Sequence, residues 1–344
     1  MANNNENKIL NVPHLRFPEF TEEWKETKLG KIAEITKGSG ISKDRLSEYG
    51  SPCILYGELY TKYKSEIINE VYSRTELDSS LLVKSKANDV IIPCSGETAI
   101  DISTARCVPF NNILLGGDLN IIRLKNNDGG FFAYQLNGTR KKDIARVAQG
   151  VSVVHLYGEN LKHIRVYHPA IEEQKKITRL LSLIDKRIAT QNKIIEDLKK
   201  LKSAIIEIEY SPKDSYHSHI GGAIVQISKR NKDNHLCNVL SVSNRQGFIK
   251  QSEQFEDRNV ASDDTSNYKI VEKNDFAYNP ARINVGSIAR LTKFETGIVS
   301  PMYICFRTKD CLLPEYLELF FESRNFFYHI PVSYTHLRAH ETEA

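Results

Sequence analysis

The sequence predicts an α+β protein in which two globular mixed α/β domains are joined by a long coiled-coil-type helix. Three observations support this fold class. A helical run without glycine or proline occupies the middle of the chain, short β-branched and aromatic runs lie on both sides of it, and the two flanks resemble each other faintly. The length of 344 residues also suits about two domains. We expect a first domain over residues 14–168, a spacer helix over 169–210 and a second domain over 217–330.

Composition favours a soluble, cytoplasmic protein. The net charge of +4 is only mildly basic, so charge alone does not identify a nucleic-acid binder. No apolar stretch approaches the roughly 20 residues that span a bilayer, and the first residues lack the basic and apolar regions of a signal peptide. The six cysteines form no CxxC pair, which indicates reduced thiols rather than disulfides or a metal site.

The central helix is predicted from the residues at its ends. Pro169 suits a first helical turn, and the carboxylates of Glu172 and Glu173 favour the positive end of the helix dipole. Pro212 ends the helix. An ordinary amphipathic core helix is the alternative, but the length and the regular apolar spacing favour an interdomain helix that packs along a second, similar helix.

Apolar residues recur along this helix at positions a and d of a heptad, and only Arg187 and Gln191 interrupt the stripe. We call these apolar residues the seam. The seam comprises Ile177, Leu180, Ile184, Ile194, Leu198, Leu201, Ile205 and Ile208.

The flanks indicate a duplicated module. Each contains short strand-like runs, loops rich in Gly, Asn and Ser, and a short helix near its end. Three pairs of segments recur in the same order at nearly constant spacing: LGKIAEITKG with IGGAIVQISKR, NDVIIPCSG with NDFAYNPAR, and YQLNGTR with ELFFESR.

The order of these features resembles the specificity subunit of type I restriction–modification enzymes. The resemblance covers about residues 14 to 330, and its most specific part is HPAIEEQKKITRLLSLID, a strand followed by proline, a helix start and heptads. It implies two target-recognition domains that each read half of a split site in double-stranded DNA, with paired helices that hold them at a fixed separation.

The same resemblance implies that this chain performs no chemistry. Its partners are then methyltransferase subunits and restriction/translocase subunits, and the cofactors S-adenosylmethionine, ATP and Mg belong to those partners rather than to this chain. The sequence agrees, because the YNPAR segment lacks the second proline and the aromatic residue of an adenine-methyltransferase loop, and no GxxxxGK[ST] phosphate loop is present.

Candidate DNA contacts are basic, amide, hydroxyl and aromatic side chains in glycine-rich or tyrosine-rich segments. Forked and amide groups read base edges, whereas lysine and arginine hold phosphates. The candidates in the first domain are Lys37, Ser39, Lys43, Arg45, Tyr60, Lys62, Tyr63 and Lys64. The candidates in the second domain are Lys229, Arg230, Asn279, Arg282, Asn284 and Arg290.

Two functions remain open from the sequence: a DNA-reading scaffold in a restriction–modification assembly, and a non-DNA-binding interaction protein that dimerises through the central helix. The repeat places a second long helix beyond Ala344, so we expect a C-terminally truncated chain whose unpaired helix self-associates. Residues 331–344 resemble a translated sequencing adapter and are expected to be a non-native tail.

Overall fold

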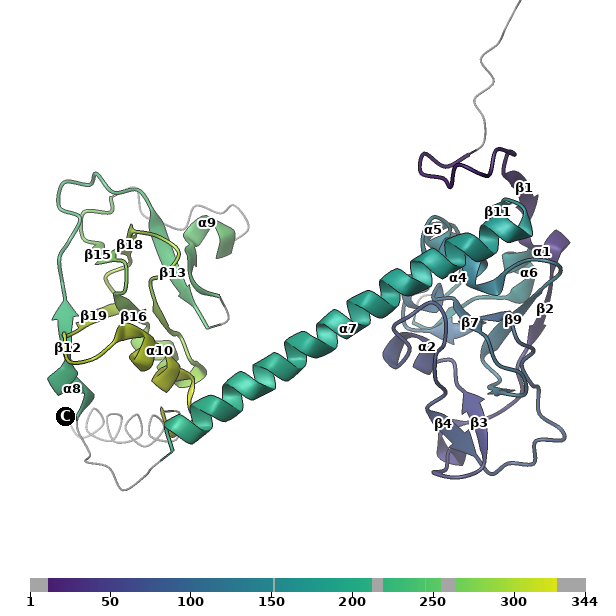
Figure 1. Cartoon of the computed structure of the whole chain (residues 1–344), viewed down its shortest axis with the longest axis horizontal. Coiled ribbons are helices and arrows are strands. Elements are labelled where there is room, and N and C mark those ends of the chain that lie inside the picture. The colour runs from purple at the N-terminus through teal and green to yellow at the C-terminus, as the bar shows by residue number, and fades with distance from the viewer. Residues whose placement is uncertain (1–11, 151, 212–218, 245, 255–263, 327–344) are drawn as a thin grey trace, which may run out of the picture. The chain divides into compact units, whose positions relative to one another are not determined.

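The structure is a computed structural model, and it describes residues 12–150, 152–211, 219–244, 246–254 and 264–326. The chain divides into two compact units, Met1–Asn192 (unit 1) and Lys193–Ala344 (unit 2), with the boundary inside the long helix α7 (Figure 1). Both units mix helices with strands, which confirms the predicted α+β class with a long central helix. The predicted tail, residues 331–344, and both predicted limits of the second domain lie outside the described residues.

The core of unit 1 is formed by a four-stranded antiparallel sheet and a three-stranded sheet. The central strand β5 has the sequence DVIIP and is buried along its whole length, as its β-branched residues lead one to expect. The four-stranded sheet has the order β2 (Ala33–Lys37), β9 (Leu119–Leu124), β5 (Asp89–Pro93) and β7 (Arg106–Val108). The three-stranded sheet has the order β4 (Ser73–Thr75), β3 (Ser51–Ile54) and β8 (Leu114–Leu115), with β3 and β8 parallel.

Two short strand pairs and several short helices complete unit 1. The pairs are β1 (Lys25–Lys28) with β11 (Arg165–His168) and β6 (Ser95–Gly96) with β10 (Val154–His155). The helices are α1 (Leu29–Ile32), η1 (Lys43–Arg45), α2 (Glu58–Thr61), α3 (Ala99–Ile102), α4 (Gly129–Asn137), α5 (Lys141–Val147) and α6 (Gly158–Lys162). Helix α4 packs Phe131 and Phe132 into the core, and Asp128 caps its first turn, because its carboxylate accepts from the Phe131 N–H at 2.7 Å.

Helix α7 (Ile171–Glu209) is one uninterrupted helix of 39 residues, about 58 Å long. The chain segment that precedes β1 contacts the first turn of α7. Arg16 donates to both carboxylate oxygens of Glu173, at 2.8 and 2.7 Å, and the Glu173 side chain is 1% exposed. Further along, Tyr134 of α4 donates to Asp185 at 2.6 Å, so the first half of α7 is anchored to unit 1.

Most of the seam is open to solvent. Seven of its eight residues, all but Ile177, are 46–60% exposed, whereas Ile177 is half-buried and packs against the unit 1 core. Ile188 and Ile195, which stand beside the seam at heptad position e, are also about half exposed. The apolar surface of α7 is therefore wider than the a/d pattern alone indicates.

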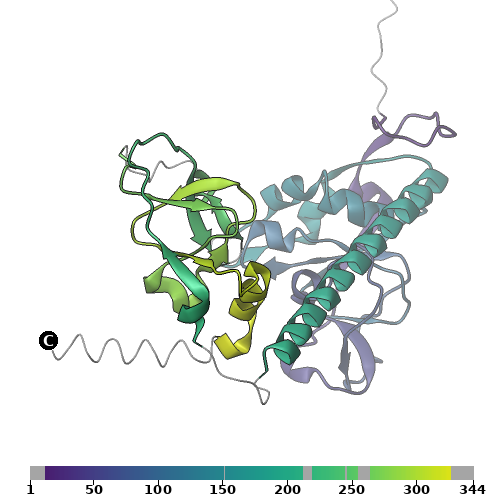
Figure 2. The same cartoon turned by 60° about the vertical axis from the view of Figure 1, so that its left-hand side comes forward.

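Unit 2, which lies at the front in Figure 2, has two four-stranded sheets, and the first of them repeats the strand order of the four-stranded sheet in unit 1. One sheet has the order β12 (Ile224–Ile227), β19 (Ile304–Thr308), β16 (Phe276–Tyr278) and β17 (Ile288–Arg290). The other has the order β14 (Gly247–Lys250), β13 (Val239–Ser243), β18 (Thr296–Val299) and β15 (Lys269–Glu272). The helices of unit 2 are α8 (Ile220–Ala223), α9 (Gln251–Gln254), η2 (Pro280–Val285) and α10 (Pro314–Glu322). Helix α10 lies against the last turns of α7, where the Tyr210 hydroxyl donates to the Tyr316 carbonyl at 2.5 Å.

The duplication is visible at the start of the central strand of unit 1. Asn88 has a left-handed backbone (φ 80°), which turns the chain into β5. The next residue, Asp89, is buried, and its carboxylate accepts from Arg123 at 2.9 and 2.7 Å and from the Lys86 N–H at 2.8 Å.

Unit 2 repeats this arrangement group by group. Asn274 has a φ of 72°. Asp275 is buried and accepts from Arg307 at 2.6 and 3.0 Å and from the Glu272 N–H at 2.7 Å. Since the same turn, carboxylate and cross-strand arginine recur in sheets of the same order, the structure confirms the repeat indicated by the two Asn-Asp segments.

Candidate nucleic-acid interface

Unit 1 contains a cleft of about 900 Å³ bordered by three chain segments. These are the loop that follows β2 and carries η1, the helix α2, and the turn at residues 116–118 between β8 and β9. We call it the unit 1 cleft. Its lining includes cations, a carboxylate and aromatic rings, among them Lys43, Tyr56, Tyr60, Lys62 and Asp118.

Glu58 holds helix α2 in place in the wall of this cleft. Its side chain is only 8% exposed. One carboxylate oxygen accepts from the Leu55 N–H at 3.0 Å, and the other accepts from Lys62 Nζ at 2.7 Å and from the Ser73 hydroxyl. Because the carboxylate is fully engaged, Glu58 is a structural anchor, and it orients Lys62, whose side chain is 46% exposed.

The tyrosines predicted as DNA contacts in unit 1 have different environments. Tyr60 is 40% exposed at the cleft, and partial burial raises the pKa of its hydroxyl. Tyr63 is 5% exposed, stacks on Tyr72 with ring centroids 5.5 Å apart, and belongs to the core. Tyr60 can therefore contact a ligand in the cleft, whereas Tyr63 is packed in the core of unit 1.

The other candidates in unit 1 do not all meet at the cleft. Lys43 lines it. Arg45 extends from η1 with 64% of its side chain exposed, and Lys37 and Lys64 are also exposed. The Ser39 hydroxyl accepts from the Val83 N–H at 2.8 Å, so its polar group is engaged inside the unit.

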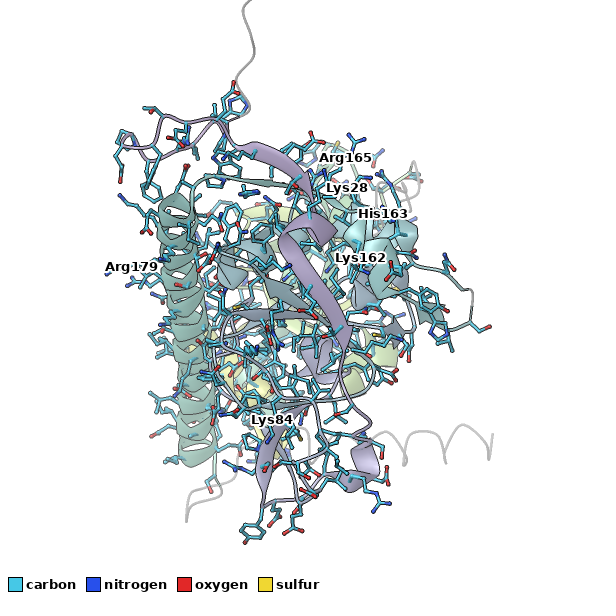
Figure 3. The ribbon with its side chains drawn as sticks, turned by 90° about the vertical axis from the view of Figure 1, so that its right-hand side faces the viewer. Lys28, Lys84, Lys162, His163, Arg165 and Arg179 are labelled. Atoms are coloured by element: carbon cyan, nitrogen blue, oxygen red, sulfur yellow. The ribbon has the colours of Figure 1, made fainter. Side chains whose placement is uncertain are left out.

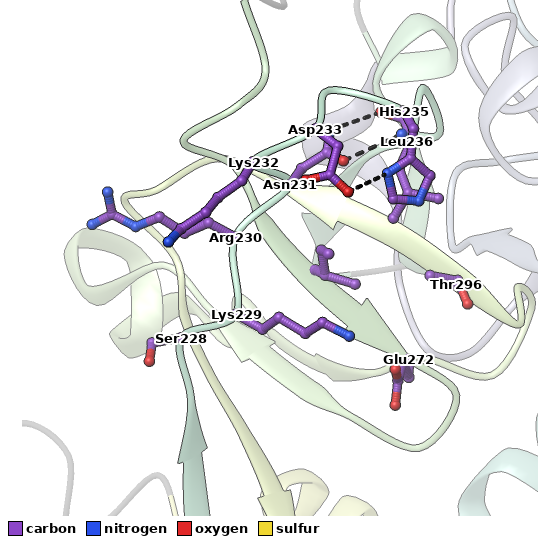
Figure 4. Close-up of a pocket in the computed structure, with 11 residues that line it drawn as sticks. Ser228, Lys229, Arg230, Asn231, Lys232, Asp233, His235, Leu236, Glu272 and Thr296 are labelled. Atoms are coloured by element: carbon purple, nitrogen blue, oxygen red, sulfur yellow. Dashed lines mark hydrogen bonds and ion pairs between the residues drawn. The ribbon is translucent and has the colours of Figure 1, made fainter.

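Unit 2 has a cleft of about 1000 Å³ beside the loop that follows β12 (Figure 4). We call it the unit 2 cleft. Lys229 and Arg230 line it, together with Lys232, which is not among the candidates predicted from the sequence. In Figure 4 the Lys229 side chain extends toward Glu272, whereas Arg230 and Lys232 project from the loop on another side.

The loop of the unit 2 cleft is held by Asn231, which is 1% exposed. Its amide donates to the Leu236 carbonyl at 3.0 Å and to the Thr265 hydroxyl at 3.2 Å, and it accepts from the Leu236 N–H at 3.2 Å. At the cleft wall, the hydrogen bond from Arg307 lowers the pKa of Glu272. The Glu272 carboxylate is thus ionised and paired with Arg307. The cations of the loop are therefore the groups available to an external anion.

The remaining candidates of unit 2 lie around η2 and α10. Asn279 caps η2 by accepting from the Ala281 N–H at 3.0 Å, and this turn presents Arg282 to solvent. Arg290 is 11% exposed and is paired with Glu318 at 2.8 Å and with Glu315. The side chain of Asn284 lies outside the described part of the structure.

A further basic group in unit 1 was not found from the sequence. Lys28 and Arg165 are directly opposite each other on β1 and β11, and Lys162 and His163 lie next to them (Figure 3). Lys162 pairs with the exposed Glu159 at 2.5 Å. Lys162, His163 and Arg165 are close in the sequence, whereas Lys28 is remote from them and reaches Arg165 through the β1–β11 pairing. No local pattern could reveal that Lys28 joins this group.

None of the described residues forms a group of three or more His, Cys, Asp or Glu that could hold a metal ion. In the described part of the chain, no helix is both long and apolar enough to cross a membrane.

Comparison with protein families gives a match over residues 21–200, just over half of the chain, to the type I restriction modification DNA specificity domain. The chain belongs to this family. The match includes all of the unit 1 cleft and most of α7. The family assignment confirms the resemblance to type I specificity subunits, with recognition of DNA targets as the family's role.

Two relatives from Methanocaldococcus jannaschii are type I restriction enzyme specificity subunits by name. The MjaVIII specificity subunit is 24% identical over 198 residues, which cover 56% of this chain and 42% of that protein. The putative MjaX specificity subunit is 31% identical over 99 residues, which cover 28% and 23%, respectively. The chain spans less than half the length of these two relatives.

The crystal structure of the S subunit of the type I restriction–modification system of M. genitalium is similar in fold. The superposition covers 90% of this chain and 80% of that one, with a TM-score of 0.54 and 14% sequence identity. This likeness concerns the fold of the specificity chain alone.

Proposed function

We propose that this chain is the sequence-reading component of a type I restriction–modification complex and that it reads a bipartite DNA target. Each unit reads one half of the site. The observation that carries the proposal is the repeated module. Its copy in unit 1 matches the specificity family, and each copy has a cleft lined by lysine side chains, joined in unit 2 by Arg230. Cations at the rim hold phosphates, while groups inside a cleft reach base edges.

We further propose that the chain performs no chemistry of its own. Methyltransferase subunits and restriction/translocase subunits dock on it, and S-adenosylmethionine, ATP and Mg act in those subunits. The chain then decides where on the DNA the chemistry takes place.

The test uses the chain co-purified with the methyltransferase subunits of the same system. The complex is expected to prefer one split DNA sequence, and the logarithm of its affinity is expected to fall linearly with the logarithm of salt concentration. Mapping of methylated sites gives the sequence of both half-sites. A purified complex that neither prefers a sequence nor loses affinity with salt contradicts the proposal.

Arg282 offers a test of the second reader. If its guanidinium makes a bidentate contact to a guanine, Arg282→Ala and Arg282→Lys should both lose about 1–3 kcal/mol of binding free energy at one base of one half-site. Lysine keeps the positive charge but cannot donate two parallel hydrogen bonds from a planar group. If Arg282 instead holds a phosphate, Arg282→Lys should bind like the unaltered chain, and Arg282→Ala should weaken binding to all sequences equally. Competition binding with single-base variants of the mapped site distinguishes the two roles.

A second candidate function, an interaction protein that associates through α7, is favoured by the exposed seam. A contiguous apolar stripe of this length rarely stays bare in water. Self-association and DNA reading are compatible, and only salt-dependent, sequence-preferring DNA binding separates the two proposals.

A further inference from the structure

Two glycines in the wall of the unit 1 cleft have no structural reason to be glycine. A Cβ added to Gly40 would meet no atom within 4 Å, and a Cβ added to Gly57 would meet only the Tyr60 hydroxyl, at 3.8 Å. Gly57 has an ordinary helical backbone (φ −64°, ψ −23°), and Gly40 is not in the left-handed region either. The fold therefore accepts a side chain at both positions.

Glycines elsewhere in the same cleft behave differently. A Cβ at Gly116 would lie 3.1 Å from the Ile54 carbonyl oxygen, and one at Gly117 would lie 3.3 Å from the Gly40 backbone. Those two positions are limited by the packing of the turn. At Gly40 and Gly57, by contrast, the space that a side chain would fill is the open volume of the cleft.

The lining of the cleft indicates what could use that volume. Tyr56 and Tyr60 offer apolar ring faces, while Lys43 and Lys62 offer donors. Asp118 is exposed at the rim, and its carboxylate forms no hydrogen bond or ion pair with the described residues. A carboxylate repels phosphates but accepts from the amino group of cytosine, so this mixture fits base edges better than the DNA backbone.

We propose that the edges of bases in one DNA half-site enter the unit 1 cleft, and that Gly40 and Gly57 determine recognition because their missing side chains leave the space that the DNA occupies. This inference rests on the proposed DNA-reading function. It assigns the major-groove edge of a base pair, including an amino base opposite Asp118, as the ligand of the cleft.

The experiment compares three single variants in the complex with the methyltransferase subunits: Gly40→Leu, Gly57→Leu and Gly221→Leu. Gly221 is the matched control, because a Cβ there also meets nothing within 4 Å, but it lies on α8 of unit 2, outside the cleft. The probe is duplex DNA that carries the mapped site. Thermal unfolding is measured for each variant alongside DNA affinity and the sequences methylated.

We expect all three variants to unfold at the temperature of the unaltered chain. The two cleft variants should bind the site about tenfold more weakly or worse and accept different bases in one half-site, while the other half-site and the Gly221→Leu variant stay unchanged. Binding and methylation that are unaltered in both cleft variants overturn the inference.

Two further results remain decisive. If leucine lowers the unfolding temperature, Gly40→Ala and Gly57→Ala replace the leucine variants, since a methyl group fits both positions. Weaker DNA binding by a stably folded alanine variant supports the inference. Full DNA binding by both alanine variants overturns it. If the unaltered complex shows no sequence preference at all, the proposed function fails together with this inference, whereas unaltered binding in the variants refutes the inference alone.

Discussion

A chain that carries Leu198→Glu and Leu201→Lys is expected to sediment as a monomer at concentrations at which the unaltered chain self-associates. Both leucines are more than half exposed on α7 and belong to the seam. Burying a half-exposed leucine stabilises an interface by about 1 kcal/mol. Losing two of them in each of two copies weakens association by about 4 kcal/mol, or about a thousandfold.

The control for this prediction exchanges charges on another face of the same helix. Glu196→Lys with Lys199→Glu leaves the net charge and the seam unchanged, so it should associate like the unaltered chain. Sedimentation over a concentration series provides the measurement. A clean monomer of the unaltered chain at micromolar concentration would be evidence against an associating seam.

Replacement of Arg123 by alanine is expected to destabilise unit 1 selectively. The Asp89 side chain is 2% exposed, and without Arg123 it keeps only the hydrogen bond from the Lys86 N–H. Breaking a buried ion pair by removing one partner costs about 3–5 kcal/mol; since Arg123 is 30% exposed, we expect about 3 kcal/mol. The transition of unit 1 in thermal unfolding should therefore move to lower temperature, while unit 2 keeps its own.

The repeated module supplies the companion variant. Arg307→Ala should destabilise unit 2 instead, and by less, because Arg307 is 48% exposed and water can replace part of its interaction with Asp275. Arg146→Ala is the surface control, since its partner Asp143 is itself 34% exposed and Arg146 is 75% exposed. Hydrogen exchange assigns each loss to its unit. Equal destabilisation of both units by Arg123→Ala would refute their independence.

The sequence alone determined the features that depend on local periodicity and local turn chemistry. Helix α7 follows from the heptad spacing and from terminal signals such as Pro169, because neighbours three and four residues apart share a helix face whatever surrounds them. The duplication follows from the two Asn-Asp turns at Asn88 and Asn274, because a left-handed residue before a buried strand is a local requirement.

Only the tertiary structure decided which candidate side chains are free to meet a ligand. Arg290 and Arg282 look alike in the sequence, but Arg290 is enclosed by carboxylates of α10 whereas Arg282 is exposed. Tyr60 and Tyr63 differ in the same way, one at the cleft and one in the core. A side chain's partners come from distant segments, and its availability depends on them rather than on its sequence neighbours.

The tertiary structure likewise decided where cations gather and where space remains. Lys28 meets Arg165 only because β1 pairs with β11 in that register. Gly40 and Gly57 border one cleft only because the loop after β2 and the start of α2, which are remote in the chain, line the same space. Strand register and cavity shape arise from packing between segments that are remote in the chain. Local sequence preferences do not predict such long-range contacts.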